Sequence, residues 1–212
     1  MKSEHIPKAT IGRLAVYIQV LTNFKREGVE VISSEKLAKA CSANPSQIRK
    51  DLAYFGEFGV RGVGYYVDEL INSIKQSLGV DRTWNCCIVG LGNLGRALLK
   101  YKDFQRKGFL LKAAFDCDPY KIGEVIEGLE VICTRQIKDK IHDLDLEIGI
   151  ITTPTERAQR AANYLVDAGI KGIINFAPSR ISVPDHIAVE YVDFFHHFYS
   201  VAFKINMELS GS

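Results

Sequence analysis

The stretch 86-CCIVGLGNLGRALLKYKDF-104 is the most informative part of this sequence for the fold. It begins with a short apolar run, turns through three glycines in the pattern G-x-G-x-x-G, and continues with the periodicity of a helix. A glycine turn between a strand and a helix is typical of dinucleotide-binding domains. We therefore expect Gly90 to make the turn, Gly92 to let the backbone approach a pyrophosphate at the helix N-terminus, and Gly95 to let helix and strand pack closely.

A carboxylate follows the next predicted strand. This strand, 110–115, ends at Asp116, 21 residues after Gly95, where such domains bond the ribose hydroxyls of the cofactor. Asp118 is a local alternative. We favour Asp116 because it lies at the end of the predicted strand. A carboxylate there repels the 2′-phosphate of NADP(H), so the sequence predicts NAD(H). The cofactor-binding residues predicted in this half are Gly90, Leu91, Gly92, Asn93, Leu94, Gly95 and Asp116.

Two further strands, 147–152 and 171–176, flank a helical pattern at 156–168. Alternating strand and helix predicts a parallel sheet, in which ligands bind beyond the carboxyl ends of the strands. The loops after these two strands should therefore border the nicotinamide half of the pocket. They supply four more candidates, Thr152, Thr153, Pro154 and Asn175.

The N-terminal third has the pattern of three helices, at 11–24, 35–41 and 45–55. Ser33 and Ser34 are cap candidates for the second, and Asn44 with Pro45 begins the third. Two helices joined by a four-residue turn predict a helix-turn-helix. The side chains expected on the inner faces are Ile11, Leu14, Ala15, Ile18, Leu21, Leu37, Ala38, Cys41, Ile48, Leu52 and Phe55, with Val20 and Phe24 on an adjoining stripe.

The third helix leaves polar side chains toward solvent, and a glycine-rich segment follows it. Ser46, Gln47, Arg49 and Lys50 are suited to contact base edges and phosphates, in the manner of a recognition helix. Residues 56–65 alternate glycine with apolar residues, which predicts a hairpin wing, with strand periodicity at Val63, Tyr65 and Val67. Arg61 at its tip could enter a minor groove. A helix at 68–78 would close this domain.

Charge and composition agree with a nucleic-acid partner for the first domain. Residues 1–80 hold 11 Lys/Arg against 8 Asp/Glu, whereas 81–212 hold 16 against 17. No apolar run reaches the roughly 20 residues that cross a bilayer, and no signal peptide is recognisable, so we expect a cytoplasmic protein without membrane contact. The five cysteines lack metal or disulfide spacing and are interpreted as reduced packing residues, so no metal is predicted.

The chain lacks the residues of an enzyme and ends in an unusually aromatic segment. His142, His186, His196 and His197 have no nucleophile, lysine or metal constellation beside them, so no catalytic residues are predicted. The terminal segment, 192–209, predicts a helix that is apolar on most faces and needs burial that a small domain cannot easily supply. We expect a partner subunit to cover it.

With both halves considered, the chain resembles the redox-sensing transcriptional repressor (Rex) family over nearly its whole length. The segments that carry the resemblance are QIRKDLAYFG (47–56), GVRGVGY (59–65), GLGNLG (90–95), FDCDP (115–119), GIINFAP (172–178) and VDF (192–194). It implies a homodimer with a swapped C-terminal helix, binding to palindromic operator DNA, and release when NADH binds.

The resemblance also assigns residues. DNA contacts fall on Ser46, Gln47, Arg49, Lys50, Tyr54 and Arg61, and Phe194 would cover the nicotinamide. Tyr101 and Asp193 are placed in a polar network that couples the domains. Some members of the family carry an arginine in the first helix that joins this network; here position 19 is Gln, although Arg13 is present and is the candidate for this network.

The predicted architecture is α/β, with a winged helix-turn-helix at 1–82, a Rossmann-like parallel-sheet domain that binds NAD(H) at 83–192, and a domain-swapped dimerisation helix at 193–212. A homodimeric, NADH-responsive repressor is the function it favours. Two alternatives stay open: a small NAD-dependent oxidoreductase, and a constitutive DNA-binding protein with a vestigial Rossmann domain. The missing catalytic constellation and the wing argue against the oxidoreductase.

Overall fold

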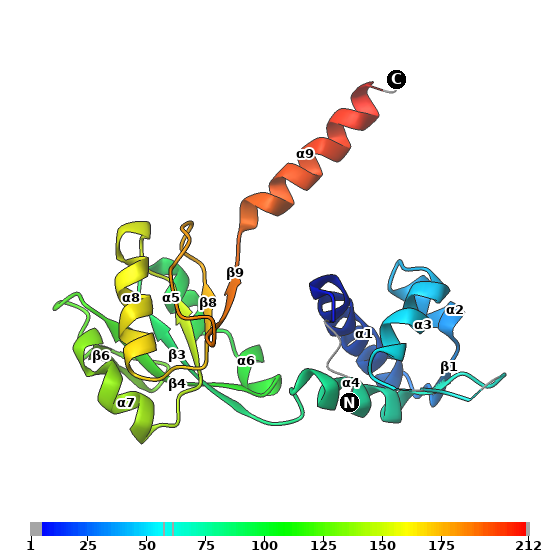
Figure 1. The fold of residues 1–212 in the computed structure, drawn as a ribbon, viewed down its shortest axis with the longest axis horizontal. Coiled ribbons are helices and arrows are strands. Elements are labelled where there is room, and N and C mark those ends of the chain that lie inside the picture. Colours follow the sequence, from blue (N-terminus) through cyan, green and yellow to red (C-terminus); the bar gives the residue numbers. More distant parts are fainter. Residues whose placement is uncertain (1–5, 57, 61, 211–212) are drawn as a thin grey trace. The chain divides into compact units, whose positions relative to one another are not determined.

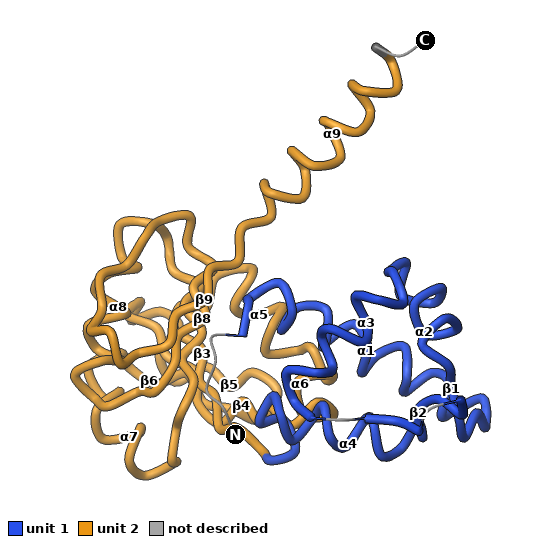
Figure 2. The backbone as a smooth tube through the Cα atoms, turned by 45° about the vertical axis from the view of Figure 1, so that its right-hand side comes forward, with its two compact units in different colours: residues 1–82 blue, residues 83–212 orange. Residues whose placement is uncertain are grey.

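The computed structural model describes residues 6–56, 58–60 and 62–210. The chain divides into two compact units, residues 1–82 and 83–212, which are described here one at a time (Figure 2). In the described part of the chain, no helix is long and apolar enough to span a bilayer.

Unit 1 is a small helical domain with a two-stranded sheet. Its elements are α1 (Lys8–Arg26), β1 (Val31–Ile32), α2 (Ser34–Ala40), α3 (Pro45–Ala53), β2 (Tyr65–Tyr66) and α4 (Val67–Leu78) (Figure 1). Ser33 Oγ accepts a hydrogen bond from the Lys36 N–H, and Asn44 Oδ1 accepts one from the Ser46 N–H, so both predicted caps of the helix-turn-helix are confirmed.

The inward face of the first helix differs from the predicted one at three positions. Leu14 and Leu21 are buried as expected, but Ile11 and Ala15 are exposed, and Tyr17 is almost fully buried in their place. The prediction followed apolar residue types alone. The Tyr17 hydroxyl donates a hydrogen bond to Asp51 of α3, and this buried partner makes a tyrosine a better inward residue than its hydropathy suggests.

The segment predicted as a wing forms a short antiparallel turn. Val60 and Gly64 exchange backbone hydrogen bonds across it, and Gly64 has a left-handed φ of 114°. The strand that continues from it, β2, pairs with β1, a partner the sequence did not reveal. Val67 was expected in the strand, but it begins α4 and its side chain lies in the helical core. Arg61 lies outside the described residues.

Unit 2 is built on one seven-stranded sheet with the strand order β5-β6-β4-β3-β7-β8-β9 (Figure 1). Every neighbouring pair is parallel except the β5–β6 hairpin. The strands are β3 (Trp84–Val89), β4 (Phe109–Asp116), β5 (Val125–Ile126), β6 (Leu129–Cys133), β7 (Ile148–Ile151), β8 (Gly172–Asn175) and β9 (Ala188–Tyr191). Without the hairpin strand β5, this is the strand order of a Rossmann domain.

Helices cover both faces of the sheet. Alternate strand residues such as Val89 and Phe115 pack with α7 (Ile137–Asp143) and α8 (Thr155–Asp167), whereas Ile88 and Ala114 pack with α5 (Asn93–Leu99) on the other face. This division follows from the twofold alternation of side chains along a strand. The order reverses between β3 and β7, so the place where such sheets bind ligands lies beyond the ends of these two strands.

Two further features of unit 2 differ from the expectation. The pattern 96–104 forms two helices, because α5 ends at Leu99 and a separate short helix, α6 (Asp103–Arg106), follows. The long helix α9 (Phe194–Ser210) follows β9 and lies in the segment predicted as a terminal helix. Strands β5, β6 and β9, a 3₁₀ turn at Thr134–Gln136 and helix α7 were not predicted, since their apolar runs are short.

Candidate functional site

The glycine turn has the geometry that each glycine was expected to supply. Gly90 has a φ of 103°, and a Cβ there would lie 2.9 Å from the backbone of Thr152 and Thr153. A Cβ on Gly95 would collide with the carbonyl oxygen of Gly90, so helix α5 and the turn can pack closely only with glycine at this position. Gly92 faces open space within 4 Å. The turn therefore leaves room for a ligand at its middle glycine.

Asp116, at the end of β4, is tied to this turn. Its Oδ2 accepts hydrogen bonds from the Leu91 N–H at 2.7 Å and from Lys121 Nζ at 3.1 Å, and its Oδ1 accepts one from the Asp118 N–H at 2.9 Å. Burial alone would raise the pKa of this carboxyl, but these donors hold its pKa below the usual range. Asp116 is therefore a buried, ionised acceptor at the ligand edge of the sheet.

The alternative carboxylate, Asp118, has a different role. Its Oδ1 accepts a hydrogen bond from the Tyr120 N–H at 3.0 Å, which closes a local turn, and its Oδ2 lies 3.7 Å from Lys121 Nζ. It does not line the cavity described next, whereas Asp116 does. The structure thus favours Asp116 over Asp118 as the ligand-facing acid.

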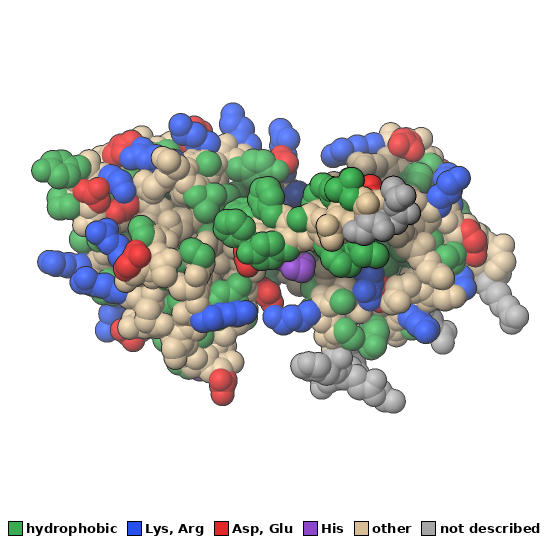
Figure 3. Space-filling view, turned by 90° about the horizontal axis from the view of Figure 1, so that it is seen from above, with side chains coloured by type: hydrophobic (Ala, Val, Ile, Leu, Met, Phe, Trp, Pro, Cys, Tyr) green, Lys and Arg blue, Asp and Glu red, His purple; other side chains and the backbone are tan. Residues whose placement is uncertain are grey.

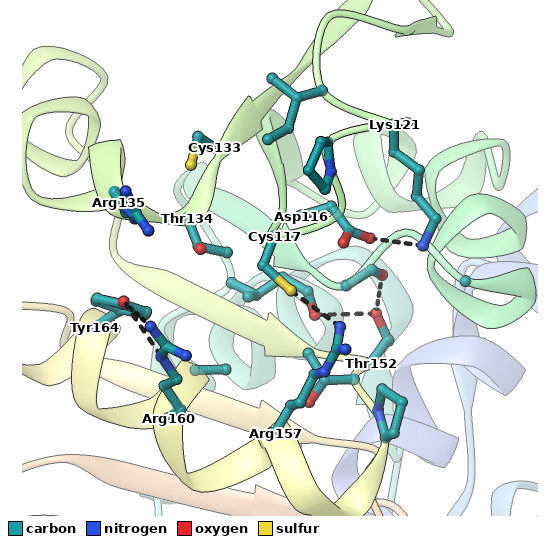
Figure 4. A pocket seen from close by; sticks show the side chains of 18 residues that line it. Asp116, Cys117, Lys121, Cys133, Thr134, Arg135, Thr152, Arg157, Arg160 and Tyr164 are labelled. Atoms are coloured by element: carbon teal, nitrogen blue, oxygen red, sulfur yellow. Dashed lines mark hydrogen bonds and ion pairs between the residues drawn. The ribbon is translucent and has the colours of Figure 1, made fainter.

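A cavity of about 690 Å³ opens beside the turn (Figure 4). Predicted residues that line it are Gly90, Gly92, Asp116, Thr152, Thr153 and Pro154. Thr152 Oγ1 donates to the Gly90 carbonyl at 2.6 Å, which ties the β7 loop to the glycine turn. Thr153 Oγ1 is buried and has no hydrogen-bond partner among the described residues, so it is available to a bound molecule.

These features fit a dinucleotide. A glycine that leaves room for a pyrophosphate, a buried acid for ribose hydroxyls and an unpaired hydroxyl are the groups such a cofactor needs. The sequence missed several other cavity residues, namely Cys117, Lys121, Cys133, Thr134, Arg135, Arg157, Arg160 and Tyr164. For Arg157 and Arg160 the sequence did contain a signal. Both are basic residues near the start of the helix that follows a ligand loop, where the helix dipole ordinarily favours acidic side chains.

Other predicted cofactor residues do not line the cavity. Leu91 is fully buried in the core beside α5, while Asn93 and Leu94 begin that helix. Asn175 is also fully buried, and it donates to the Ser179 carbonyl and accepts from the Ala177 N–H. These residues therefore shape the turn and the β8 loop.

Phe194 begins α9 beside the loop that follows β8. Its ring lies 6.3 Å from that of Phe176, and it is 54% exposed. The two rings come from the end of β8 and the start of α9. They form an aromatic pair next to the loop after β8, which was expected to border the nicotinamide half of the pocket.

The cysteines divide into two groups. Cys86 and Cys87 are buried in β3, as expected of packing residues, and burial raises the pKa of both thiols. Cys117 departs from the expectation because it is exposed, lines the cavity and accepts a hydrogen bond at Sγ from Arg157 Nη1 at 3.1 Å. Its position directly after the strand end places it outside the core.

The outer side of α3 carries the residues predicted to contact DNA. Ser46, Arg49, Lys50 and Tyr54 are exposed, and Gln47 is half-buried. Arg49 Nη1 donates to Ser34 Oγ at 2.8 Å and lies 3.7 Å from a carboxylate oxygen of Glu35. The guanidinium is therefore held over the α2 N-terminus.

The inner side of α3 is anchored by Asp51, which is fully buried. Its carboxylate accepts hydrogen bonds from Arg13 Nε at 2.6 Å, Tyr17 Oη at 2.8 Å, Gln47 Nε2 at 2.9 Å and Thr10 Oγ1 at 3.2 Å. Burial favours the neutral acid, but these donors keep the pKa of Asp51 below its usual range. The network joins α1 to α3.

The three residues assigned to a coupling network each have a local partner. Arg13 is bound to Asp51, as described above. The Tyr101 hydroxyl donates to Asp103 Oδ2 at 3.2 Å, and Asp193 Oδ1 accepts from the Phe195 N–H at 2.9 Å. Asp193 therefore caps α9. A coupling role for these residues stays a prediction.

Fold and cavity together define a dinucleotide-binding type of domain joined to a winged helix-turn-helix. Comparison with known proteins agrees. Residues 5–53 match the family described as "Putative DNA-binding protein N-terminus", and residues 81–179 match the family described as "CoA binding domain". The chain is 77% identical to the redox-sensing transcriptional repressor Rex of Maridesulfovibrio salexigens, covering 97% of this chain and 99% of that protein.

The redox-sensing transcriptional repressor Rex of Syntrophobacter fumaroxidans is 52% identical to this chain, over 97% of this chain and 99% of that protein. The chain belongs to the redox-sensing transcriptional repressor Rex family. Among solved structures, a repressor called RSP in complex with NAD⁺ and operator DNA matches with a TM-score of 0.91 and 39% identity, covering 97% of this chain and 95% of that one. The RSP complex with NADH matches with a TM-score of 0.88, 37% identity and 97% coverage of both chains.

Proposed function

We propose that this protein is a transcriptional repressor that binds palindromic operator DNA and is released from it when NADH occupies the cavity beside Gly92 and Asp116. The observation that carries this proposal is the presence of both sites in one chain: an exposed recognition helix in unit 1 and a dinucleotide cavity in unit 2. The RSP structures with operator DNA and with NADH support it.

On the DNA side, we assign the contacts to the outer face of α3. Arg49 and Lys50 supply positive charge, Ser46 and Gln47 are polar groups near the helix N-terminus, and Tyr54 lies at its C-terminal end. Arg61 stays a candidate for a minor-groove contact. The helix begins with a satisfied cap at Asn44 and is anchored through Asp51, so these side chains stand on a rigid support.

On the cofactor side, we assign the pyrophosphate to the glycine turn, the ribose hydroxyls to Asp116 and the nicotinamide to the aromatic pair Phe176–Phe194. NADH carries a neutral ring and NAD⁺ a cationic one. An aromatic enclosure favours the neutral ring, because a buried cation loses its hydration. A thousandfold preference requires only about 4 kcal/mol.

We further propose that two chains associate through α9, with the helix exchanged between them. Along this helix, large apolar side chains are left in solvent, including Phe198 at 69%, Phe203 at 66% and Leu209 at 74% exposure. In the space-filling view, taken from the side toward which α9 rises in Figure 1, hydrophobic side chains gather on the surface (Figure 3). An apolar helix of this length is covered in a stable protein. Residues 193–212 would then be a dimerisation segment.

We also propose that the protein is a regulator without catalytic activity and that it acts in the cytoplasm, where operator DNA and NADH meet. Four histidines lie in unit 2, and none of them lines the cavity. The described residues include no group of His, Cys, Asp or Glu that could hold a metal ion. An oxidoreductase would require an acid or base at the nicotinamide end.

An operator-binding titration tests the proposal. Fluorescence anisotropy of labelled operator, with NADH and NAD⁺ added in parallel, should show release at lower concentrations of NADH. Phe194→Ala should weaken NADH binding more than NAD⁺ binding in calorimetry and leave the DNA complex insensitive at the NADH concentration that releases the wild type. Equal binding of operator at all NADH concentrations would support the constitutive alternative, and consumption of NADH absorbance with added substrates would support an oxidoreductase.

A further inference from the structure

The cavity carries more positive charge than its one acid balances. Among the described residues that line it, Asp116 is the only carboxylate, whereas Lys121, Arg135, Arg157 and Arg160 are cationic. Lys121 Nζ lies 3.1 Å from Asp116 Oδ2, so these two charges form a pair. Three guanidinium groups are left over.

The surplus arginines have neutral partners. Arg157 Nη1 donates to the Cys117 thiol at 3.1 Å, and Arg160 Nη2 donates to the Tyr164 hydroxyl at 3.1 Å. Across the described ranges of the chain, no carboxylate lies within 4.0 Å of Arg135, Arg157 or Arg160. These three arginines are exposed and line one cavity without a counter-charge, which an anionic ligand would supply.

Two of these arginines, Arg135 and Arg160, lie apart from Lys121 and Thr152, whereas Arg157 stands beside Thr152 (Figure 4). In Figure 4, Arg135, Arg160 and Tyr164 stand on the side of the cavity away from Lys121 and Thr152. The pyrophosphate of a bound NAD(H) belongs at the glycine turn, and its adenine carries no charge. Neither part of the cofactor supplies a counter-charge to Arg135 and Arg160.

We propose that Arg135, Arg157 and Arg160 form an anion subsite for the terminal phosphates of a nucleoside di- or triphosphate, which occupies the cavity in place of NAD(H). Guanidinium groups bind phosphate oxygens in bidentate pairs, and three of them suit a chain of phosphates. The ribose of such a nucleotide has Asp116 as its acceptor, and Pro119, Ile122 and Ala161 offer apolar surface to its base.

The two ligands exclude one another because they share Asp116. The apparent affinity for NADH then falls as the nucleotide concentration rises, and the redox response becomes dependent on phosphorylated nucleotides. This inference adds a second ligand to the cavity and goes beyond the proposed function.

Calorimetry on the full-length chain tests the subsite, with ATP, adenosine and inorganic tripolyphosphate titrated separately. ATP should bind more tightly than either fragment, and its presence should raise the apparent Kd for NADH in proportion to its concentration. Tripolyphosphate binding as tightly as ATP, or ATP binding no more tightly than adenosine, would overturn the assignment. So would an NADH Kd that ATP leaves unchanged.

A pair of variants separates the subsite from the dinucleotide site. The double variant Arg135→Ala, Arg160→Ala should weaken ATP at least about tenfold, since hydrogen bonds between charged groups are the strong ones, and leave the NADH Kd within about twofold. Lys138→Ala, an exposed lysine of α7 away from the cavity, is the matched control and should leave both ligands unchanged.

Parallel loss of NADH and ATP affinity in the double variant would mean that the arginines hold the dinucleotide's own phosphates, which overturns the inference. If ATP fails to bind while NADH still releases the wild-type protein from operator DNA, the subsite is wrong and the proposed function stands.

Discussion

The side chain of Gln47 donates a hydrogen bond through Nε2 to Asp51 Oδ1, 2.9 Å away and one turn further along α3. Asp51 is buried and ionised, so it can only accept, and the amide nitrogen of Gln47 must face it. The Gln47 oxygen is left for another partner. At the start of a recognition helix, this oxygen would accept from an exocyclic amino group of adenine or cytosine.

The first prediction follows from this fixed amide. One operator position in each half-site should prefer a base with an exocyclic amino group in the major groove, and Gln47→Ala should remove about 1–3 kcal/mol of that preference. Asp51→Asn should relax it as well, since an amide partner no longer dictates which way Gln47 points. Anisotropy on operators with all four base pairs at each position measures this. Asp68→Asn, an exposed acid of α4, is the control, and an intact preference in both test variants would refute the orientation.

Arg49 and Lys50 should affect DNA binding in different ways. Arg49→Ala should cost about 1–3 kcal/mol if the guanidinium leaves Ser34 and Glu35 to read a guanine, and Lys50→Ala should reduce the slope of log K against log salt by about 1 if it meets a phosphate. Salt-dependent operator binding separates the two effects. Lys75→Ala at the end of α4 serves as control, and unchanged binding in both variants would remove α3 from the interface.

Asp116 should select NADH over NADPH. Asp116→Ala should weaken NADH and narrow the preference, because the carboxylate accepts from ribose hydroxyls and repels a 2′-phosphate. Asp118→Ala, two residues away and outside the cavity lining, is the control. It should change neither the affinity for NADH nor the preference for NADH over NADPH. Calorimetry with both cofactors checks this, and a wild type that binds them equally would show that the acid is misassigned.

Helix α9 should be necessary for dimerisation. Truncation before Tyr199 removes most of its exposed apolar side chains and should give monomers, with operator binding weakened because two half-sites must be engaged at once. Sedimentation and operator binding measure both effects. A point variant, Phe203→Glu, tests the same face without shortening the chain, and a stable dimer in both variants would contradict the interface.

The buried carboxylate of Asp51 should make unit 1 acid-sensitive. Its pKa is lower in the folded state than the roughly 3.9 of an unfolded aspartate, so its contribution is complete above that pH and is lost as pH falls through the folded value. The free energy of unfolding of wild type should exceed that of Asp51→Asn by about 1–3 kcal/mol at neutral pH, and the difference should shrink near pH 3. Urea unfolding at the two pH values measures it; an equal difference at both would show that the ionised form is not the stabilising one.

Local patterns predicted much of the fold correctly. The caps at Ser33 and Asn44 and the glycine turn were predicted because each depends on a few neighbouring residues. The inward face of α1 was predicted only in part: Tyr17 was missed, since it is held by Asp51, which is 34 residues away in the sequence. The pairing of β1 with β2 was missed as well, because strands of two residues are too short to show a periodic pattern.

Sequence patterns were enough to predict the division into two units, the position of the glycine turn and the place of Asp116 at a strand end, because these depend on short-range spacing and on the conformations that glycine permits. Which charged residues line the cavity together depends on the folded chain. Arg135 follows β6, whereas Arg157 and Arg160 belong to α8, and they meet because parallel strands end at one edge of the sheet. The same holds for Asp51, whose ionised state depends on donors from another helix.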